Sequence, residues 1–298
     1  MSVDVESAKP DCEICVQAKQ SVKPFDGIPD RKSIPGELTH IDLWGKYDIA
    51  SINGHQYYIL FVDDAMRYVT VHFLKRKDEA VQHVKNYIQA LKTHKRSLMA
   101  IKIDRGKEFL NEALKTFLDI KGLDIQATAP YSPSQNGIAE RMNCTLVESG
   151  HTMLRGQDLP EFLWEYAIAH AAYLCNRSYT KSLNNITPYQ KWNKSKPNVT
   201  HLQEFGAPVW VLLQGQKVPR KMLAKSQRRA YIGFDDGSKS VLYYNAETQK
   251  VLTSWNYHFL SITNTTPPGE IVVAPDKPHE VEMGSSTLPM GGDGQKRK

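Results

Sequence analysis

The chain has 298 residues, which is long enough for two domains with buried cores. Hydrophobic residues make up 41% and charged residues 23%, a composition that excludes a largely disordered chain. The longest uncharged apolar run spans residues 57–62, far short of the ~20 residues that cross a bilayer, so we expect a soluble, intracellular protein without membrane contact. The formal net charge of +6 favours a polyanionic partner.

The first part of the chain predicts an arm followed by three strands. Residues 1–35 contain Pro24, Pro29 and Pro35 and are expected to form an extended arm. Three apolar stretches follow at residues 38–43, 57–62 and 68–74, and Asn53-Gly54 is a turn signal between the first two. We predict three consecutive antiparallel strands.

Helical and strand-like patterns alternate in the next part. Apolar spacing predicts helices over residues 78–94 and 107–121, and short β-type runs predict strands over residues 98–103 and 123–127. Two further helices are expected over about 134–154 and 160–179. This order predicts an α/β domain over residues 36–186, with a ribonuclease H-like mixed five-stranded sheet flanked by helices.

The last part predicts a second, smaller domain. Residues 187–204 have the composition of a linker, and from residue 205 the apolar period changes to two. Strands are expected over residues 208–213, 229–234, 241–244 and 251–259, giving a small all-β domain over residues 205–262. Residues 263–298 are rich in Pro, Gly and Ser and are expected to form a disordered tail.

Three carboxylates occupy positions from which a metal-binding side chain could point out of a packed scaffold. Asp42 lies between two apolar residues on the predicted first strand, Asp104 ends the fourth strand, and Glu140 follows a loop marked by Pro and Gly. The ordinary alternatives are a solvent-facing strand residue, a helix N-cap and an exposed helical glutamate. Three such groups could hold two Mg²⁺ ions, which activate a hydroxyl and stabilise the leaving oxygen at phosphorus.

Several motifs around these carboxylates resemble those of copia-type retrotransposon integrases. The motifs are HID at residues 40–42, FVDD at 61–64, DRGKEF at 104–109, PYSPSQNGIAERMN at 130–143 and NR at 176–177. Thirty-five residues separate Asp104 from Glu140, the spacing that names the retroviral integrase class. The second domain also resembles the family, through HL at residues 201–202, FG at 205–206, YIGF at 231–234 and YN at 244–245. In the family this domain is a small Src-homology-3-like barrel, and the likeness covers roughly residues 37–260.

The resemblance implies a DNA integration enzyme, a DDE-type polynucleotidyl transferase and endonuclease. Asp42, Asp104 and Glu140 would be its catalytic residues and its ligands for two Mg²⁺ or Mn²⁺ ions. Asp63 and Asp64 are rival ligands, although the pair is interpreted more simply as the polar edge of the second strand. Expected partners are double-stranded DNA, as element ends and target, and further copies of the chain, because joining two ends needs at least two active sites. The expected compartment is the nucleus, with a cytoplasmic particle as a second location.

Predicted DNA contacts fall in two regions. Asn143 shares a helical face with Glu140, and Arg141 lies beside it. The other expected contacts belong to a stretch without acidic residues, where cations can track a DNA backbone: Lys217, Arg220, Lys221, Lys225, Arg228 and Arg229. Copia-type sequences usually carry Arg at the position of Cys144 and Asn at the position of Arg105, so a phosphate contact is expected to be lost.

The cysteines predict little structural chemistry. Four are too few for a disulfide scaffold, so Cys144 and Cys175 are expected to be reduced thiols. Cys12 and Cys15 have zinc-ligand spacing, but the family pairs such cysteines with two upstream histidines and none precedes His40, so zinc binding is not expected. In this comparison the chain begins within the zinc arm, as a fragment of a polyprotein or a host-retained gene would.

Two other functions stay open on the sequence alone. The incomplete arm, Cys144 and Arg105 are compatible with a catalytically silent DNA-binding or multimerisation remnant of a decayed element. A simple ribonuclease H-like nuclease is a third reading, and the second domain argues against it.

Overall fold

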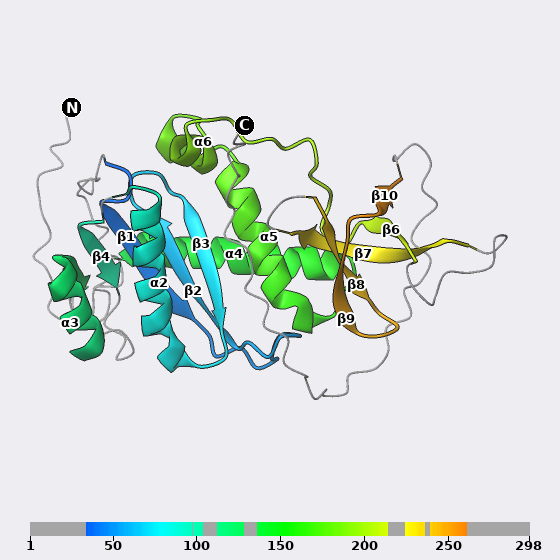
Figure 1. The fold of residues 1–298 in the computed structure, drawn as a ribbon, viewed down its shortest axis with the longest axis horizontal. Coiled ribbons are helices and arrows are strands. Elements are labelled where there is room, and N and C mark those ends of the chain that lie inside the picture. The colour runs from blue at the N-terminus through cyan, green and yellow to red at the C-terminus, as the bar shows by residue number, and fades with distance from the viewer. Residues whose placement is uncertain are drawn as a thin grey trace, which may run out of the picture. The chain divides into compact units, whose positions relative to one another are not determined.

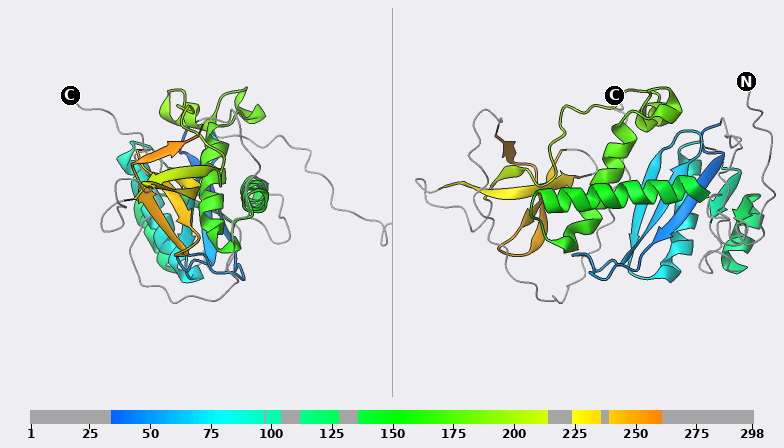
Figure 2. Two further views of the ribbon diagram at one scale, coloured as in Figure 1. Left: turned by 90° about the vertical axis from the view of Figure 1, so that its right-hand side faces the viewer. Right: turned by 180° about the vertical axis from the view of Figure 1, so that it is seen from behind.

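The computed structural model describes residues 34–96, 98–103, 112–127, 136–213, 224–235 and 239–260. All of them lie within one compact unit, residues 31–298. Two β-sheets organise these residues, and helices pack on the first sheet (Figures 1 and 2). No helix in the described ranges is both long and apolar enough to cross a membrane. Residues 1–33 of the predicted arm and the whole predicted tail over residues 263–298 lie outside the described residues.

The first sheet contains β1 (Leu38–Trp44), β2 (Tyr57–Asp63), β3 (Val69–Leu74), β4 (Ala100–Ile103) and β5 (Asp124–Ala127). Its order is β3-β2-β1-β4-β5. The first three strands are antiparallel, and β4 and β5 run parallel to β1. The predicted mixed five-stranded sheet with ribonuclease H-like order is therefore confirmed.

Helices and short 3₁₀ turns connect these strands and continue after them. They are η1 (Lys77–Glu79), α2 (Ala80–Thr93), α3 (Glu112–Lys121), α4 (Gly137–Gly156), η3 (Glu161–Leu163), α5 (Trp164–Arg177), η4 (Lys181–Leu183) and α6 (Pro188–Asn193). Helix α6 lies inside the stretch that was expected to be a linker. Its local signal is strong, because the Thr187 hydroxyl accepts a hydrogen bond from Gln190 N at 3.0 Å and Pro188 occupies the first turn.

Helices cover both faces of the first sheet, and strand β2 shows how. Tyr58, Leu60 and Val62 are buried with α4 and α5 on one face. Ile59 and Phe61 alternate with them and are buried with α2 and α3 on the other. Figure 1 shows α2 in front of the sheet, and the right panel of Figure 2, which is seen from behind, shows α4 in front of the opposite face. Because both faces are covered, β2 is apolar from Tyr57 to Val62.

The second sheet contains β6 (Pro208–Leu212), β7 (Ser226–Phe234), β8 (Val241–Asn245), β9 (Lys250–Ser254) and β10 (Tyr257–Phe259). Its order is β10-β6-β7-β8-β9, and every neighbouring pair is antiparallel. Two expectations were wrong here. The single strand predicted over residues 251–259 is two strands, and the sheet is open rather than a closed barrel, since no pairing of described residues joins β9 to β10.

The segment before β6 packs against the end of α4. Gly206 has a φ of +84°, and a Cβ at this position would lie 2.5 Å from Cβ of Gln157. Gly206 N also donates to Tyr231 O at 2.7 Å. Only glycine accommodates both the positive φ and the close approach of Gln157, which gives the Phe205-Gly206 motif a structural reason. Phe205, Ile232 and Tyr244 are buried in the same cluster as residues of α4 and α5.

Candidate active site

Asp42 lies on β1, on the side of the strand that faces α4. His40 and Trp44 share this side because side chains alternate along a strand. The carboxylate is half-buried, and both of its oxygens accept hydrogen bonds: Oδ1 from Leu43 N at 2.9 Å and Oδ2 from Asn143 Nδ2 at 2.5 Å. Asp42 is thus held against α4, which argues against an ordinary solvent-facing strand residue.

Asn143 connects Asp42 to a buried tyrosine. The Tyr58 hydroxyl donates to Asn143 Oδ1 at 2.8 Å, and Asn143 Nδ2 donates to Asp42. Burial, with a smaller effect from the Asp42 charge, raises the pKa of Tyr58 far above its ordinary value, so the hydroxyl stays protonated and remains a donor. This donor fixes which end of the Asn143 amide faces Asp42.

Asn136 fastens the start of α4 to β1. Its Nδ2 donates to Ile41 O at 3.1 Å, and its Oδ1 lies 3.2 Å from Nδ1 of His40. Because the Asn136 oxygen is an acceptor, the hydrogen of this bond belongs to His40 Nδ1. His40 Nε2 lies 3.1 Å from Oδ1 of Asp64, so one histidine ties the helix start to the end of β2.

Glu140 lies between these two anchor points on α4. It follows Asn136 by four residues and precedes Asn143 by three, so all three share one helical face. Since Asn136 and Asn143 both bond to β1, Glu140 is on the side of α4 that faces β1, at the edge of its buried stripe. It is half-buried, unlike an ordinary exposed glutamate. The structure therefore brings Asp42 and Glu140 to the same helix–strand junction.

Asp104, the third predicted carboxylate, lies outside the described residues. It follows Ile103, the last residue of β4, and Ile103 pairs with Ile41 beside Asp42. Among the described side chains no group of three His, Cys, Asp or Glu residues could hold a metal ion. The carboxylates of Asp42 and Glu140 are nevertheless the hard oxygen donors that Mg²⁺ and Mn²⁺ prefer, so the donor chemistry fits.

Asp63 and Asp64, the rival ligands, have structural roles. Both are buried at the end of β2, where they form the polar edge of the strand. Asp63 accepts from Gly36 N at 2.6 Å and from Met66 N at 2.7 Å, and burial raises the pKa of its carboxyl despite these bonds. Asp64 contacts Nε2 of His40 and, at 3.3 Å, Nη1 of Arg67. These carboxylates stabilise the turn after β2.

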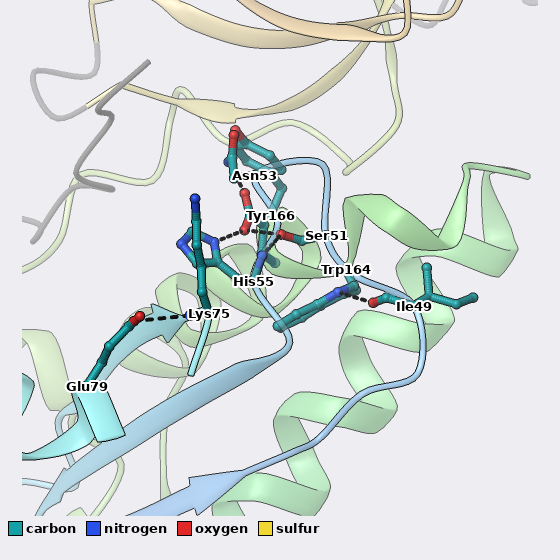
Figure 3. Close-up of polar contacts among 9 residues, drawn as sticks. Ile49, Ser51, Asn53, His55, Lys75, Glu79, Trp164 and Tyr166 are labelled. Atoms are coloured by element: carbon teal, nitrogen blue, oxygen red, sulfur yellow. Dashed lines mark hydrogen bonds and ion pairs between the residues drawn. The ribbon is translucent and has the colours of Figure 1, made fainter. Parts of the chain in front are cut away.

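A polar network that the sequence did not reveal holds the loop after β1 against α5 (Figure 3). Its centre is Glu165, which is 0% exposed. Ser51 Oγ donates to Glu165 Oε2 at 2.7 Å, His55 Nδ1 lies 2.6 Å from the same oxygen, and Asn53 Nδ2 donates to Oε1. The loop between Asp42 and β2 is thereby fixed.

Asn176 of the NR motif also has a structural role. Its Oδ1 accepts from Val69 N and its Nδ2 donates to Val69 O, both at 2.8 Å. The side chain of α5 therefore pairs with the first residue of edge strand β3 as a neighbouring strand would. The next residue, Arg177, places its guanidinium 3.4 Å from the ring centroid of Tyr173.

The predicted DNA contacts are distributed unevenly. Asn143 is at the junction, and Arg141 is exposed on the first turns of α4. Arg228 is exposed on β7 and Lys225 is exposed just before it, while Arg229 pairs with Glu247 at 3.2 Å. Cys144 and Cys175 are free thiols, as expected. The remaining predicted residues lie outside the described part of the chain: Cys12, Cys15, Arg105, Lys217, Arg220 and Lys221.

A shallow, mostly apolar depression of about 240 Å³ adjoins the junction. It is lined by Trp44, Asn143, Cys144, Val147 and Glu148. Since Asn143 also bonds to Asp42, the depression lies directly beside the candidate site.

Comparisons with known proteins were made by sequence and by structure. A scan of protein-family models found no match. The chain is 29% identical over 248 residues to the retrovirus-related Pol polyprotein from transposon TNT 1-94 of Nicotiana tabacum, covering 82% of this chain and 18% of that protein. It is 30% identical over 253 residues to the retrovirus-related Pol polyprotein from transposon RE2 of Arabidopsis thaliana, covering 83% of this chain and 17% of that protein. The chain spans less than a fifth of each relative.

Two solved structures are also similar. A chain of the simian T-cell lymphotropic virus intasome in complex with PP2A regulatory subunit B56 gamma has a TM-score of 0.49 and 16% identity, covering 81% of this chain and 84% of that one. The HTLV-2 integrase catalytic core domain in complex with magnesium has a TM-score of 0.41 and 20% identity, covering 54% and 98%.

The relatives align with more than four fifths of this chain. This confirms the resemblance drawn from the motifs. Over most of its length the chain is homologous to a segment of the Pol polyproteins of plant retrotransposons.

Proposed function

We propose that the chain is the core of a retrotransposon integrase, which nicks DNA and joins a 3′-hydroxyl to a target phosphodiester in a metal-dependent reaction. The observation that carries this proposal is the junction of β1 and α4, where Asn136 and Asn143 hold Asp42 and Glu140 on facing elements. The homology to Pol polyproteins supports it.

In the proposed mechanism Asp42 and Glu140, together with Asp104, hold divalent ions through carboxylate oxygens. When bound, two such ions would neutralise charge at the phosphorus and lower the pKa of the attacking hydroxyl or water. The chain's own contribution is positioning. Asn143, fixed by Tyr58, keeps one Asp42 oxygen in place, and Leu43 N keeps the other. Asn136 prevents the helix that carries Glu140 from sliding along β1.

The same proposal includes the DNA partners and the assembly. Exposed cations near β7, Lys225 and Arg228, are proposed to contact DNA phosphates, together with Arg141 on α4. Element ends and target DNA would be bound by a multimer, because each chain contributes one junction. Chromosomal DNA as target makes the nucleus the proposed compartment.

A strand-transfer and nicking assay in Mg²⁺ and in Mn²⁺ tests the proposal. Glu140→Gln should lower the rate by on the order of a hundredfold or more, since it removes a charged ligand. Glu148→Gln is the matched control, because Glu148 is an exposed glutamate two turns further along the same helix. Equal activity of the wild type and Glu140→Gln, or no divalent-dependent activity of the wild type under any condition, would contradict the proposal. The second result would instead support the silent DNA-binding remnant.

A further inference from the structure

Trp210 occupies an unusual position in the second sheet. Its neighbours Val209 and Val211 are buried in the core cluster on one face of β6. Trp210 points to the opposite face, which it shares with the exposed residues Pro208 and Leu212. The indole is half-buried and belongs to none of the three core clusters formed by the described residues. This aromatic side chain therefore lies on the face of β6 opposite to Val209 and Val211 and outside the core clusters.

The register of the sheet places a nitrogen-bearing side chain on each side of this indole. Trp210 pairs directly with His258 of β10 and with Arg228 of β7, and both partners are exposed. Directly opposite residues point to the same face, with Cβ atoms about 5 Å apart. His258, Trp210 and Arg228 thus form one row across three neighbouring strands, β10, β6 and β7 (Figure 1).

The stretch of sequence that carries Trp210 and Arg228 has charges of one sign. Residues 205–234, which include β6, β7 and the segment between them, contain six Lys or Arg and no Asp or Glu. Of the cations in the described part of this stretch, Arg229 pairs with Glu247, whereas Lys225 and Arg228 are exposed near the row. The potential at this face therefore favours an anion, and the aromatic ring at its centre favours a planar apolar group.

We infer that the row His258–Trp210–Arg228 is a binding site for unpaired DNA, with a base stacked on Trp210 and phosphates next to Arg228 and Lys225. A base presents its flat face only when it is unstacked from its neighbours, so a duplex cannot use the indole in this way. A sheet face with an aromatic between cations is a general solution for holding single strands. The identity of the ligand as DNA rests on the proposed function, and the site adds the class of DNA, the unpaired strand.

The experiment measures the affinity of the full chain for a fluorescein-labelled thymidine oligonucleotide and for a duplex of equal length, by anisotropy. Trp210→Ala should weaken binding of the single strand by about tenfold, and binding of the duplex by less than about twofold. Trp255→Ala is the matched control, because Trp255 is a 74% exposed tryptophan in the connection between β9 and β10 and does not belong to the row. It should leave both affinities unchanged.

Two further variants keep the test decisive. Trp210→Phe retains a ring and should keep most of the single-strand affinity, even where Trp210→Ala perturbs the fold. Arg228→Gln should reduce the slope of log affinity against log salt concentration for the single strand by about 0.7. Equal losses for single strand and duplex, or equal effects of Trp210→Ala and Trp255→Ala, would overturn the inference. Asp42→Asn separates the two proposals: it should abolish strand transfer and leave single-strand affinity intact, so either proposal can fail alone.

Discussion

Asp42 at β1 and the pair Asp63 and Asp64 at the end of β2 are acidic groups on neighbouring strands with opposite uses. Asp63 is fully buried, and its two oxygens accept backbone N–H groups from Met66 in the turn after β2 and from Gly36 just before β1. Asp42 is half-buried, and its partners are the adjacent backbone and the side chain of Asn143. The comparison teaches that the partners of a carboxylate, more than its place at a strand, separate a structural acid from a candidate metal ligand.

The largest expected effect is on activity. Asp42→Asn should reduce metal-dependent strand transfer by on the order of a hundredfold or more, because a neutral amide is a poorer ligand for a hard cation. Its thermal unfolding should stay close to that of the wild type, since Asp42 is half-buried. Strand-transfer rates and calorimetry check the two parts. If Asp42→Asn were strongly destabilised but kept the wild-type rate per folded molecule, Asp42 would be the structural acid and the comparison would be reversed.

Asn143→Ala tests whether the position of Asp42 matters. The variant leaves one Asp42 oxygen and the Tyr58 hydroxyl without their amide partner, so the rate should fall by about 10- to 100-fold. The Mg²⁺ concentration needed for half-maximal rate should rise, a change that a purely structural defect would not produce. Tyr58→Phe should show the same trend with a smaller size, and an unchanged Mg²⁺ requirement in both variants would sink the positioning role.

Asp63→Ala should act on stability. It removes the acceptor for Gly36 N and Met66 N, which would destabilise the fold by about 3 kcal/mol. Urea unfolding measures the loss, and strand transfer per folded molecule should be nearly unchanged. A rate loss as large as that of Asp42→Asn with unchanged stability would show Asp63 to be the functional acid.

A buried histidine extends the comparison to pH. His170 on α5 packs against the rings of Phe205 and Tyr231, and burial lowers its pKa to about 4. The unfolded chain, with an ordinary pKa near 6.5, binds more protons between these values, so the stability present above pH 6.5 is lost as the pH falls toward 4. The loss from pH 7 to pH 5 should be about 2 kcal/mol.

His170→Gln should flatten this pH dependence in urea titrations, and the exposed His94→Gln should not. His72, whose pKa burial also lowers to about 4, will leave part of the slope in both variants. Identical slopes in the wild type and His170→Gln would contradict the role given to His170.

The main fold could be predicted because its signals are local. Strand β2 is buried on both faces and is therefore a continuous apolar run in the sequence. Helix α2 is buried on one face and therefore has apolar residues at helical spacing. The division of residues 251–259 into two strands could not, since Trp255-Asn256 carries no Gly or Pro signal. Helix α6 was missed although the sequence carries a usable helix-start signal, Thr187 as N-cap followed by Pro188.

The candidate site, like the fold, could be predicted from the sequence only in part. Asp42 and Glu140 could be found because motifs mark them. The bonds that place them could not, because they join residues far apart in the chain: Asn136 to Ile41, and Asn143 to Asp42 and Tyr58. Glu165 was missed for the same reason, since its partners on the loop after β1 lie more than one hundred residues earlier.

The central claim is that Asp42 and Glu140 act together in one metal-dependent site. Single-turnover strand transfer by the wild type, Asp42→Asn, Glu140→Gln and the double variant tests it most directly. If the two carboxylates act as a unit, the double variant should be no slower than the slower single variant. Losses that multiply in the double variant, or a single variant with the wild-type rate, would contradict the claim.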